Sequence, residues 1–402
     1  MYFSTISPKQ ASGKRVLVRA DLNVPIVDGE IQDLTRIIRF ANGMKPYLNE
    51  GAKLIVMSHF GRPKGESNQK MSLIQISEAL ETAIGVKIIF SNDCIGSDVV
   101  NASQNLKEGN VLLCENLRFY PQEEDNDKDF ADQLSKLGDI FINDAFSCAH
   151  RAHASTYTIT QFIDSYFGPL MIEEINALNA ALESPQSPSV AIVGGSKVSS
   201  KISVLKNLVS KLDALIIGGA MANTFFLYEK YEIGKSLVEK GQLDIVKEIK
   251  ELASKSNCEL ILPHDFVCAT ELKKGVSSQI FNLGECSKNH MILDVGPSSL
   301  KLFNKILSNS KTILWNGPIG AFEVPPFNKS SIALAKHIGE LTAKQKIKSV
   351  AGGGDTVSAI NISGVLDKFS YVSSAGGAFL EWLEGKELPG ILAIENKSIQ
   401  LK

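Results

Sequence analysis

The sequence has little net charge and no apolar run of membrane-spanning length. Its 402 residues include 42 basic and 44 acidic side chains, which gives a formal net charge of -2. This balance argues against a general electrostatic attraction to nucleic acid or to an acidic membrane surface, so any basic site must be local. The N-terminal segment 1–14 has no apolar core of signal-peptide length, and the most apolar later run, 212–228, contains Asp213, Asn223 and paired glycines. We therefore expect neither a targeting segment nor a membrane span.

The six cysteines include no Cys-x-x-Cys pair. They are Cys94, Cys114, Cys148, Cys258, Cys268 and Cys286. Scattered cysteines are typical of reduced thiols in a cytoplasmic protein rather than of a disulfide or zinc framework. We therefore expect a cytoplasmic protein whose cysteines are buried and unreactive.

Two common nucleotide-binding motifs are also missing. No Gly-x-Gly-x-x-Gly fingerprint occurs, which argues against a dehydrogenase that uses a dinucleotide cofactor. The only Gly-Lys-Ser sequence, 234–236, has Glu229 where the P-loop motif requires glycine. Any phosphate-binding turn must therefore be of another kind.

Short apolar runs alternate with helix-period segments along the whole chain. This alternation is typical of βαβ units with a parallel sheet. The runs that suit buried strands are 16–18, 54–57, 87–90, 111–113 and 140–142, followed by 190–193, 215–217, 260–262, 291–293, 313–315 and 349–351. A chain of 402 residues exceeds what one hydrophobic core usually serves. The sequence therefore predicts an α/β protein with two doubly wound, parallel-sheet (Rossmann-like) domains.

The segment 168–185 predicts one long helix between these domains. Apolar residues recur at helical spacing from Met171 to Leu182, Pro169 suits the first turn, and Pro185 ends the pattern. The expected division is an N-terminal domain 1–168, an interdomain helix 169–185 and a C-terminal domain 186–387. The same periodicity also fits an ordinary surface helix within one large domain.

Polar and basic side chains follow four strand ends of the first predicted sheet. They are Asp21 and Asn23 after the first run, His59 and Arg62 after the second, Arg118 after the fourth and Arg151 after the fifth, with Arg36 in the first crossover helix. Because such sheets bind ligands at the carboxyl ends of their strands, these cations suit a small, multiply anionic metabolite. Each arginine alone also fits a solvated surface charge, and the spacing of His150 and His153 is weak support for a metal site.

Glycine turns follow several strands of the second half. In the turn 194–201, we expect Lys197 and Lys201 one helical turn apart near amides that favour phosphate. Glu323 follows another strand and suits ribose hydroxyls. The turn 352–356 permits close approach of a ligand, and Asp355 suits Mg²⁺ between phosphates, although a plain helix cap fits Asp355 as well. The helix that opens within 373–378 presents further amides. Together these features predict a nucleotide site.

These segments resemble the phosphoglycerate kinase family. The matching stretches follow the family's order along nearly the whole chain: 18–25, 58–63, 115–119, 143–146, 149–156, 194–201, 219–225, 315–323, 352–356 and 376–388. Each stretch alone is modest support, whereas ten in register make accidental similarity very unlikely.

The resemblance implies an ATP-dependent phosphotransferase with a carboxyl group as acceptor. The implied reaction is reversible phosphoryl transfer from 1,3-bisphosphoglycerate to ADP, which gives 3-phosphoglycerate and ATP in glycolysis and gluconeogenesis. It further implies Mg²⁺ with the nucleotide, hinge closure of two domains, and a C-terminal tail, about 388–402, that returns to the first domain. The family's usual form is a monomer, and the charge balance argues against a nucleic-acid or membrane partner.

Roles carried over by the resemblance fall into three sets. The substrate set is Asp21, Leu22, Asn23, Arg36, His59, Phe60, Gly61, Arg62, Arg118 and Arg151. The nucleotide set is Lys201, Asn316, Glu323, Gly353, Gly354, Asp355 and Thr356, with Asp355 also near the metal. The catalytic set is Arg36, Lys197, Gly353 and Gly376, of which Arg36 and Lys197 match residues that stabilise the moving phosphoryl group.

Two positions depart from the family pattern. Ser330-Ser331 stands where Gly-Thr is common, and Ser374-Ala375 stands where Thr-Gly is common. Neither departure removes a charged group, so we expect altered rates or closure rather than lost activity. A nonenzymatic binder of anionic metabolites remains an alternative, but it would have little use for Lys197, Lys201, Glu323 and Asp355 together.

Overall fold

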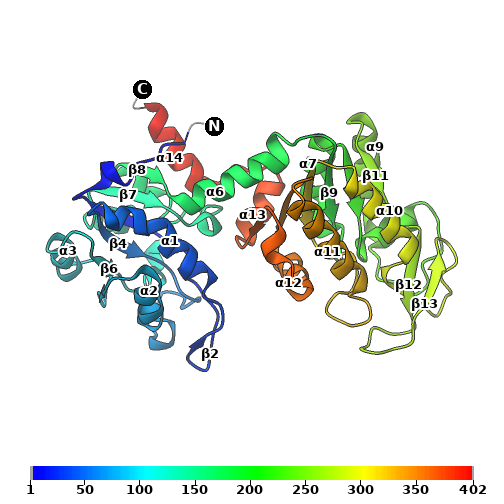
Figure 1. Ribbon diagram of the computed structural model, residues 1–402, viewed down its shortest axis with the longest axis horizontal. Coiled ribbons are helices and arrows are strands. Elements are labelled where there is room, and N and C mark those ends of the chain that lie inside the picture. Colours follow the sequence, from blue (N-terminus) through cyan, green and yellow to red (C-terminus); the bar gives the residue numbers. More distant parts are fainter. Residues whose placement is uncertain (1–2, 401–402) are drawn as a thin grey trace. The chain divides into compact units, whose positions relative to one another are not determined.

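The computed structural model describes residues 3–400 and divides into two compact units (Figure 1). The first unit runs to Ile175 and includes the chain from Glu387 onward, and the second spans Asn176–Lys386. The division lies within helix α6 (Pro169–Leu178). No helix among residues 3–400 is long and apolar enough to cross a membrane.

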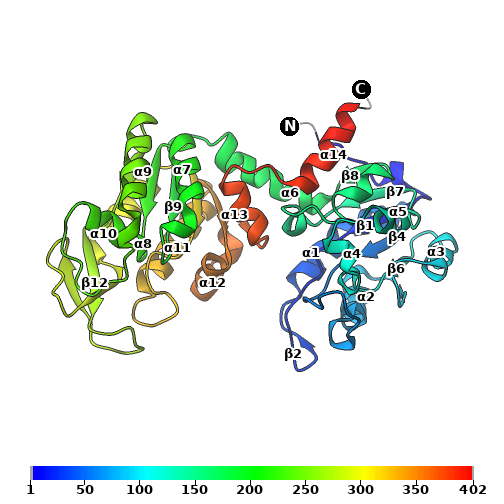
Figure 2. The ribbon, with the colours of Figure 1, turned by 180° about the vertical axis from the view of Figure 1, so that it is seen from behind.

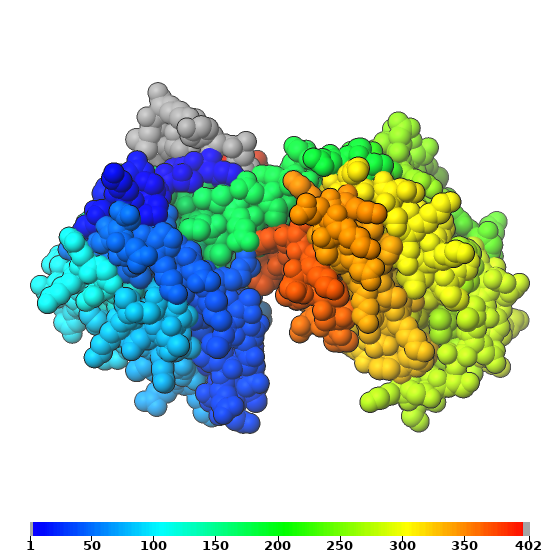
Figure 3. Space-filling view, viewed as in Figure 1, coloured from blue at the N-terminus to red at the C-terminus, as the bar shows by residue number. Residues whose placement is uncertain are grey.

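The first unit is built on a six-stranded parallel sheet of order β5-β6-β4-β1-β7-β8. Its strands are β1 (Arg15–Arg19), β4 (Lys53–Met57), β5 (Ile88–Phe90), β6 (Val111–Leu113), β7 (Ile140–Asn143) and β8 (Ser165–Phe167). Its helices are α1 (Thr35–Asn49), α2 (Ser77–Ile84), α3 (Ser97–Gln104), α4 (Pro121–Glu124), α5 (Lys128–Ser135) and α14 (Pro389–Gln400). A small antiparallel hairpin, β2 (Ile26–Val27) and β3 (Glu30–Ile31), projects from this unit (Figure 3).

Alternate residues of β1 serve two hydrophobic cores on the two faces of this sheet. Val16 and Val18 belong to the core that includes Phe40 of α1 and Leu80 of α2. Leu17 belongs to the other core, which contains apolar residues of α3 and α5. A parallel sheet covered by helices on both faces is what the apolar runs predicted, and the loops after its strands are left to carry polar residues.

The second unit repeats this plan with a parallel sheet of order β11-β10-β9-β15-β16-β17. Its strands are β9 (Ser189–Val193), β10 (Ala214–Ile217), β11 (Glu259–Ile261), β15 (Thr312–Asn316), β16 (Lys348–Gly352) and β17 (Tyr371–Ser373). Helices α10 (Pro297–Ser308), α11 (Lys329–Ala343) and α12 (Gly354–Ser363) pack together, and so do α7 (Ile202–Lys211), α8 (Met221–Tyr228), α9 (Leu243–Lys255) and α13 (Gly377–Leu383) (Figures 1 and 2). The prediction of two doubly wound α/β sheets is therefore confirmed.

One predicted strand lies in a different sheet. The run 291–293 was expected in the parallel sheet, but it forms β14 (Met291–Val295), which pairs antiparallel with β12 (Asp265–Ala269). A third strand, β13 (Gln279–Asn282), completes this small sheet. The first three residues of β14 are only partly buried, whereas every residue of β9 is buried. Strands with one exposed face suit an antiparallel sheet, so the expectation for this run was wrong.

The segment after Gly168 is helical, as its periodicity predicted. Helix α6 continues into a π-helical turn at Asn179–Glu183, which ends at Ser184. Its first turn is capped from another segment, because Leu170 N and Met171 N donate to Asp144 Oδ1 over 2.7 and 3.3 Å. Burial raises the pKa of Asp144 to about 7.

Candidate active site

In the first unit, the candidate residues lie on loops after β1, β4, β6 and β7. The strand order reverses at β1, which has β4 on one side and β7 on the other. A reversal of this kind leaves a crevice at the carboxyl ends of the strands, where ligands bind in open α/β sheets. The sequence-predicted anion site therefore falls at the position that this topology favours.

Asp21 and Arg36 form an ion pair within this site. Arg36 Nη1 lies 2.8 Å from Asp21 Oδ2 and donates to Asn23 O over 2.9 Å. Ser147 Oγ donates to the same carboxylate oxygen over 2.5 Å. Burial alone would raise the pKa of Asp21, but the charge of Arg36 and the hydrogen bonds from Ser147 and Asn23 hold it below the usual value. The carboxylate is therefore ionised and keeps Arg36 in place.

Hydrogen bonds connect three of the loops. Gly61 N donates to Asn23 Oδ1 over 3.0 Å, and Arg118 Nη1 donates to Gly61 O over 2.9 Å. The buried Asn116 completes the connection, because its side chain bonds both N and O of Phe60. Asn23, Gly61 and Arg118, which follow different strands, are thus held together as the sequence predicted.

The other predicted substrate residues divide into exposed and buried groups. Arg62 and Arg151 are exposed, so their guanidinium groups are accessible to an anion. Leu22 and Phe60 are buried in the core, where their side chains shape the loops rather than face a ligand.

The histidines of this unit are not arranged as a metal site. No group of three or more metal-binding side chains occurs among the residues described. His59 is buried beside Arg19, whose role sequence analysis missed although a charged residue within an apolar strand was a visible signal. His153 lies 3.9 Å from the buried carboxylate of Glu123, yet burial lowers the pKa of His153 to about 4, so it is neutral at physiological pH.

In the second unit, the strand order reverses between β9 and β15. The loops that follow these strands approach closely, and Gly194 N donates to Asn316 O over 3.1 Å. A Cβ on Gly317 would lie 2.1 Å from Gly194 O, so only glycine fits there. The two loops therefore cross in close contact at the topological switch point, and we call this region the glycine crossing.

Lys201 connects the two loops of this crossing. Its Nζ donates to Gly194 O over 2.8 Å, to Asn316 O over 3.1 Å and to Asn316 Oδ1 over 2.7 Å. Burial lowers the pKa of Lys201 to about 8, against the opposing charge of Asp355. Asn316 Nδ2 donates in turn to Gly352 O over 2.9 Å, which ties the third loop to the first two.

Lys197 does not share a helical face with Lys201, so that expectation was wrong. Only a short 3₁₀ turn, Ser199–Lys201, precedes α7, and Lys197 lies before it in the loop. Glu239 stabilises this loop by accepting bonds from N and Oγ of Ser199. The side chain of Lys197 is exposed and accessible to a ligand.

The glycine turn after β16 leads directly into α12. Gly353 has φ 94° and is the N-cap residue, with no side-chain capping bond. Asp355 lies in the first turn with an exposed side chain, so the plain N-cap interpretation of Asp355 was wrong. Thr356 Oγ1 instead accepts from Gly317 N over 2.6 Å. Gly354 and Asp355 therefore remain accessible at the positive end of a helix dipole.

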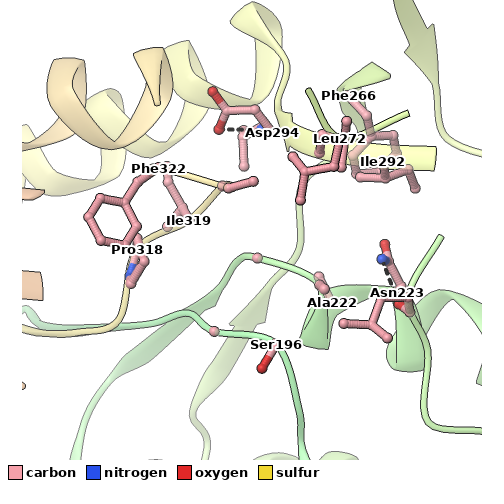
Figure 4. A pocket seen from close by; sticks show the side chains of 18 of the residues that line it. Ser196, Ala222, Asn223, Phe266, Leu272, Ile292, Asp294, Pro318, Ile319 and Phe322 are labelled. Carbon is pink, nitrogen blue, oxygen red and sulfur yellow. Dashed lines mark hydrogen bonds between the residues drawn. The ribbon is translucent and has the colours of Figure 1, made fainter. Parts of the chain in front are cut away.

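A pocket of about 350 Å³ adjoins these loops (Figure 4). Its lining includes Ser196, Ala222, Phe266, Leu272, Ile292, Pro318, Ile319, Phe322, Glu323 and Asp355. Most of these side chains are apolar, whereas Glu323 and Asp355 are exposed carboxylates. An apolar chamber beside a few polar groups suits a flat heterocycle with a polar substituent. The sequence did not predict Phe266, Leu272 or Ile292, because they lie outside the loops of the parallel sheet.

The two departures from the family pattern occupy defined positions. Ser330 N donates to Asp294 Oδ2 over 3.1 Å, and Ser331 Oγ accepts from Ile319 N over 3.1 Å. Ser331 thus supports the loop after β15, whereas Ser330 bonds to the end of β14. Ala375 is buried and precedes Gly376, which has φ 52° and is the N-cap residue of α13.

Comparison with known proteins gives one consistent result. The sequence model described as phosphoglycerate kinase matches residues 6–386. A phosphoglycerate kinase of Granulibacter bethesdensis is 49% identical over 98% of this chain and 100% of its own length. One of Rhizobium meliloti is 47% identical over 99% of this chain and all of its own.

Solved structures agree with the sequence matches. The structure of phosphoglycerate kinase from Coxiella burnetii is 40% identical, with a TM-score of 0.91 over 98% of this chain and 100% of that one. The enzyme from Pyrococcus horikoshii is 28% identical, with a TM-score of 0.78 over 96% of both chains. The chain therefore belongs to the phosphoglycerate kinase family.

Proposed function

We propose that this protein catalyses reversible phosphoryl transfer from 1,3-bisphosphoglycerate to ADP, giving 3-phosphoglycerate and ATP. The main support for this reaction is the match to the family over residues 6–386. The single structural observation that best supports it is the presence of two different loop clusters. One is rich in arginine, around the Asp21–Arg36 pair, and the other is a glycine crossing around Lys201 with an apolar pocket beside it.

The first unit is proposed to bind the phosphoglycerate. Arg36, Arg62, Arg118 and Arg151 supply cations for its phosphate and carboxylate groups, and Asn23, His59 and Gly61 supply polar contacts. Two of these arginines, Arg62 and Arg151, are exposed, whereas Arg36 and Arg118 are held in place by protein oxygens. Held arginines lose little freedom on binding an anion, which favours an oriented ligand.

The second unit is proposed to bind the nucleotide. The apolar pocket takes the base, Glu323 accepts from the ribose, and Lys201, Asn316, Gly353, Gly354 and Thr356 surround the phosphates. Mg²⁺ is commonly held by one or two carboxylates together with phosphate oxygens, and the exposed Asp355 beside the pocket fits that pattern. When bound, Mg²⁺ would neutralise charge on the nucleotide phosphates.

The protein has to align the two substrates and stabilise the charge on the transferred phosphoryl group, but it needs no general base. The donor is an activated acyl phosphate, and the attacking group is a phosphate oxygen that carries no proton to be removed. We assign Arg36 and Lys197 to the charge on the transferred group, and the amides beside Gly353 and Gly376 to its oxygens. Because the two ligands are assigned to different units, activity requires residues of both.

We also propose that the protein is a monomer and that it works in a reducing cytoplasm. All six cysteines are buried free thiols, which supports a reducing compartment. Every group assigned to the reaction comes from one chain, so no second copy is needed. Size-exclusion chromatography with light scattering tests the monomer directly.

Separate binding measurements test the assignment of the two ligands. Calorimetry should show that Arg118→Ala weakens binding of 3-phosphoglycerate and leaves Mg-ADP binding unchanged. Asp355→Asn should reduce the gain in ADP affinity that Mg²⁺ gives, with Asp367→Asn, an exposed position on the same unit, as the matched control. If Arg118→Ala weakened ADP binding and spared 3-phosphoglycerate, the assignment would be wrong.

A further inference from the structure

Arg19 is a fully buried cation at the end of β1, in the substrate unit. Its Nη1 donates to Ala20 O over 2.5 Å, and its Nε donates to Ser155 Oγ over 2.8 Å. Its Nη2 lies 3.6 Å from Cys148 Sγ and 3.3 Å from His59 Nδ1. None of the ion pairs formed within residues 3–400 includes Arg19. Its direct contacts are therefore neutral groups, of which His59 belongs to the proposed site.

The contact with His59 has only one consistent assignment of protons. A guanidinium group has donors only and stays protonated in proteins, so it cannot accept a bond from the imidazole. His59 Nδ1 must therefore carry the lone pair. In a neutral ring the proton then sits on Nε2, because the bond made by one ring nitrogen determines the state of the other.

We propose that Arg19 is a positioning residue that holds His59 as the neutral tautomer protonated at Nε2, so that His59 offers a hydrogen-bond donor to an oxygen of the anionic substrate. The neighbouring thiol of Cys148 is consistent with this assignment. Cys148 Sγ lies 3.8 Å from the same Nδ1, and burial raises the pKa of that thiol, so it stays protonated and uncharged.

The charges around His59 keep the ring neutral. Burial and the charge of Arg19 lower the pKa of His59 well below its usual value. Asp21 acts in the opposite direction, whereas Arg118 and Arg36 add to the lowering. Three arginines thus face the ring against one carboxylate, and His59 acts as a donor rather than as a cation.

A buried relay fixes the orientation of Arg19 itself. Ser155 Oγ accepts from Arg19 Nε and donates to Glu123 Oε1 over 2.5 Å, and Ser155 N donates to Glu123 Oε2 over 2.9 Å. Ser155 and Glu123 are both fully buried. Glu123 of α4 therefore fixes Ser155, Ser155 fixes the guanidinium of Arg19, and Arg19 in turn fixes the ring of His59 at the substrate site.

The role of His59 as a donor to the substrate rests on the proposed function, but the tautomer of His59 can be measured without any ligand. Nitrogen-15 NMR of the wild-type protein without ligand should show the His59 proton on Nε2, with the ring still neutral at about pH 6.5, the usual pKa of histidine. A proton on Nδ1, or a ring that is protonated at that pH, would overturn the inference. Addition of 3-phosphoglycerate then tests the site, because an unchanged His59 signal would refute the substrate assignment and leave the tautomer assignment intact.

Substitution gives an independent readout. Arg19→Met should allow both tautomers and raise the pKa of His59, so that KM for 3-phosphoglycerate becomes pH-dependent while kcat changes less. Arg19→Lys, which keeps a donor-only cation, should restore much of the Nε2-protonated form. Arg15→Met, on the same strand but paired with Asp139, is the control and should leave the His59 signal unchanged. If Arg19→Met does not fold, Ser155→Ala tests the same relay, and an unaltered His59 spectrum in a folded Arg19→Met protein would contradict the proposal.

Discussion

Nζ of Lys201 lies 2.7 Å from Oδ1 of Asn316, so two residues assigned to the nucleotide phosphates bind each other. The remaining bonds of Lys201 go to Gly194 O and Asn316 O. A phosphate oxygen that accepts a hydrogen bond from the Lys201 ammonium must therefore displace one of these three protein oxygens. Binding is an exchange of partners, and its strength depends on whether Lys201 is charged.

This exchange predicts that Mg-ADP affinity falls as the pH rises above about 8. Burial lowers the pKa of Lys201 to about 8, while a bound phosphate favours the charged form and raises that pKa. The affinity should fall by up to about tenfold per pH unit above this point. Calorimetry from pH 7 to pH 9.5 measures the slope. Lys201→Met should bind weakly with a flat profile, whereas Lys206→Met, a surface lysine of α7 paired with Glu248, should keep the wild-type slope.

Arg36→Ala should lower turnover strongly without unfolding the protein. Arg36 pairs with Asp21, and its loss removes a preorganised cation from the proposed transferred group. Loss of one such donor typically lowers kcat by about 100-fold to 1000-fold. Arg39→Ala is a matched control on the same helix, because its side chain is equally exposed at 31% and pairs with Glu173. Equal losses in both variants would contradict the assignment of Arg36.

The sequence allowed prediction of those parts of the site that follow strand ends. Asp21, His59 and Arg118 were selected because apolar runs locate the ends of parallel strands. Arg19 was missed as a functional residue, because its meaning depends on Ser155, which lies 136 residues away in the chain. Contacts at that distance leave no local pattern.

The wrong expectations also come from contacts between residues far apart in the chain. The run 291–293 has the composition of a buried strand, but its partner β12 is antiparallel, and pairing partners are not encoded in composition. Lys197 and Lys201 have helical spacing, yet the turn 194–198 is held open by contacts of Gly195 with the distant residue Met221. Tertiary contacts therefore decided both the sheet and the helix start.

Ala375→Gly should change kcat while the protein stays active. Ala375 is buried beside Gly376, whose φ of 52° marks a turn near the proposed transferred group. Glycine would loosen this turn and lower the free energy of unfolding by about 0.4 to 1 kcal/mol. Steady-state kinetics and thermal unfolding measure the two effects. An unaltered kcat would count against a role for this turn in the reaction.

Asp294→Asn should remove a pH dependence of stability. Burial raises the pKa of Asp294 to about 7 from 3.8. Between these values the folded state binds more protons than the unfolded state, so the wild-type free energy of unfolding decreases as the pH rises from 4 to 7. The wild type should lose on the order of a few kcal/mol relative to the variant over this range. Urea titrations at several pH values measure it, with Asp367→Asn, at an exposed position, as the control. Parallel pH profiles for wild type and Asp294→Asn would show that this carboxyl titrates normally.

The most direct test of the proposed reaction is turnover of 3-phosphoglycerate with Mg-ATP, coupled to NADH oxidation by added glyceraldehyde-phosphate dehydrogenase. We predict rapid turnover in the wild type that is nearly abolished in both Arg36→Ala and Lys197→Ala, one from each unit. Lys197→Ala should still bind Mg-ADP and Arg36→Ala should still fold. Absence of turnover in folded wild-type protein that binds both ligands, or full activity in either variant, would contradict the account.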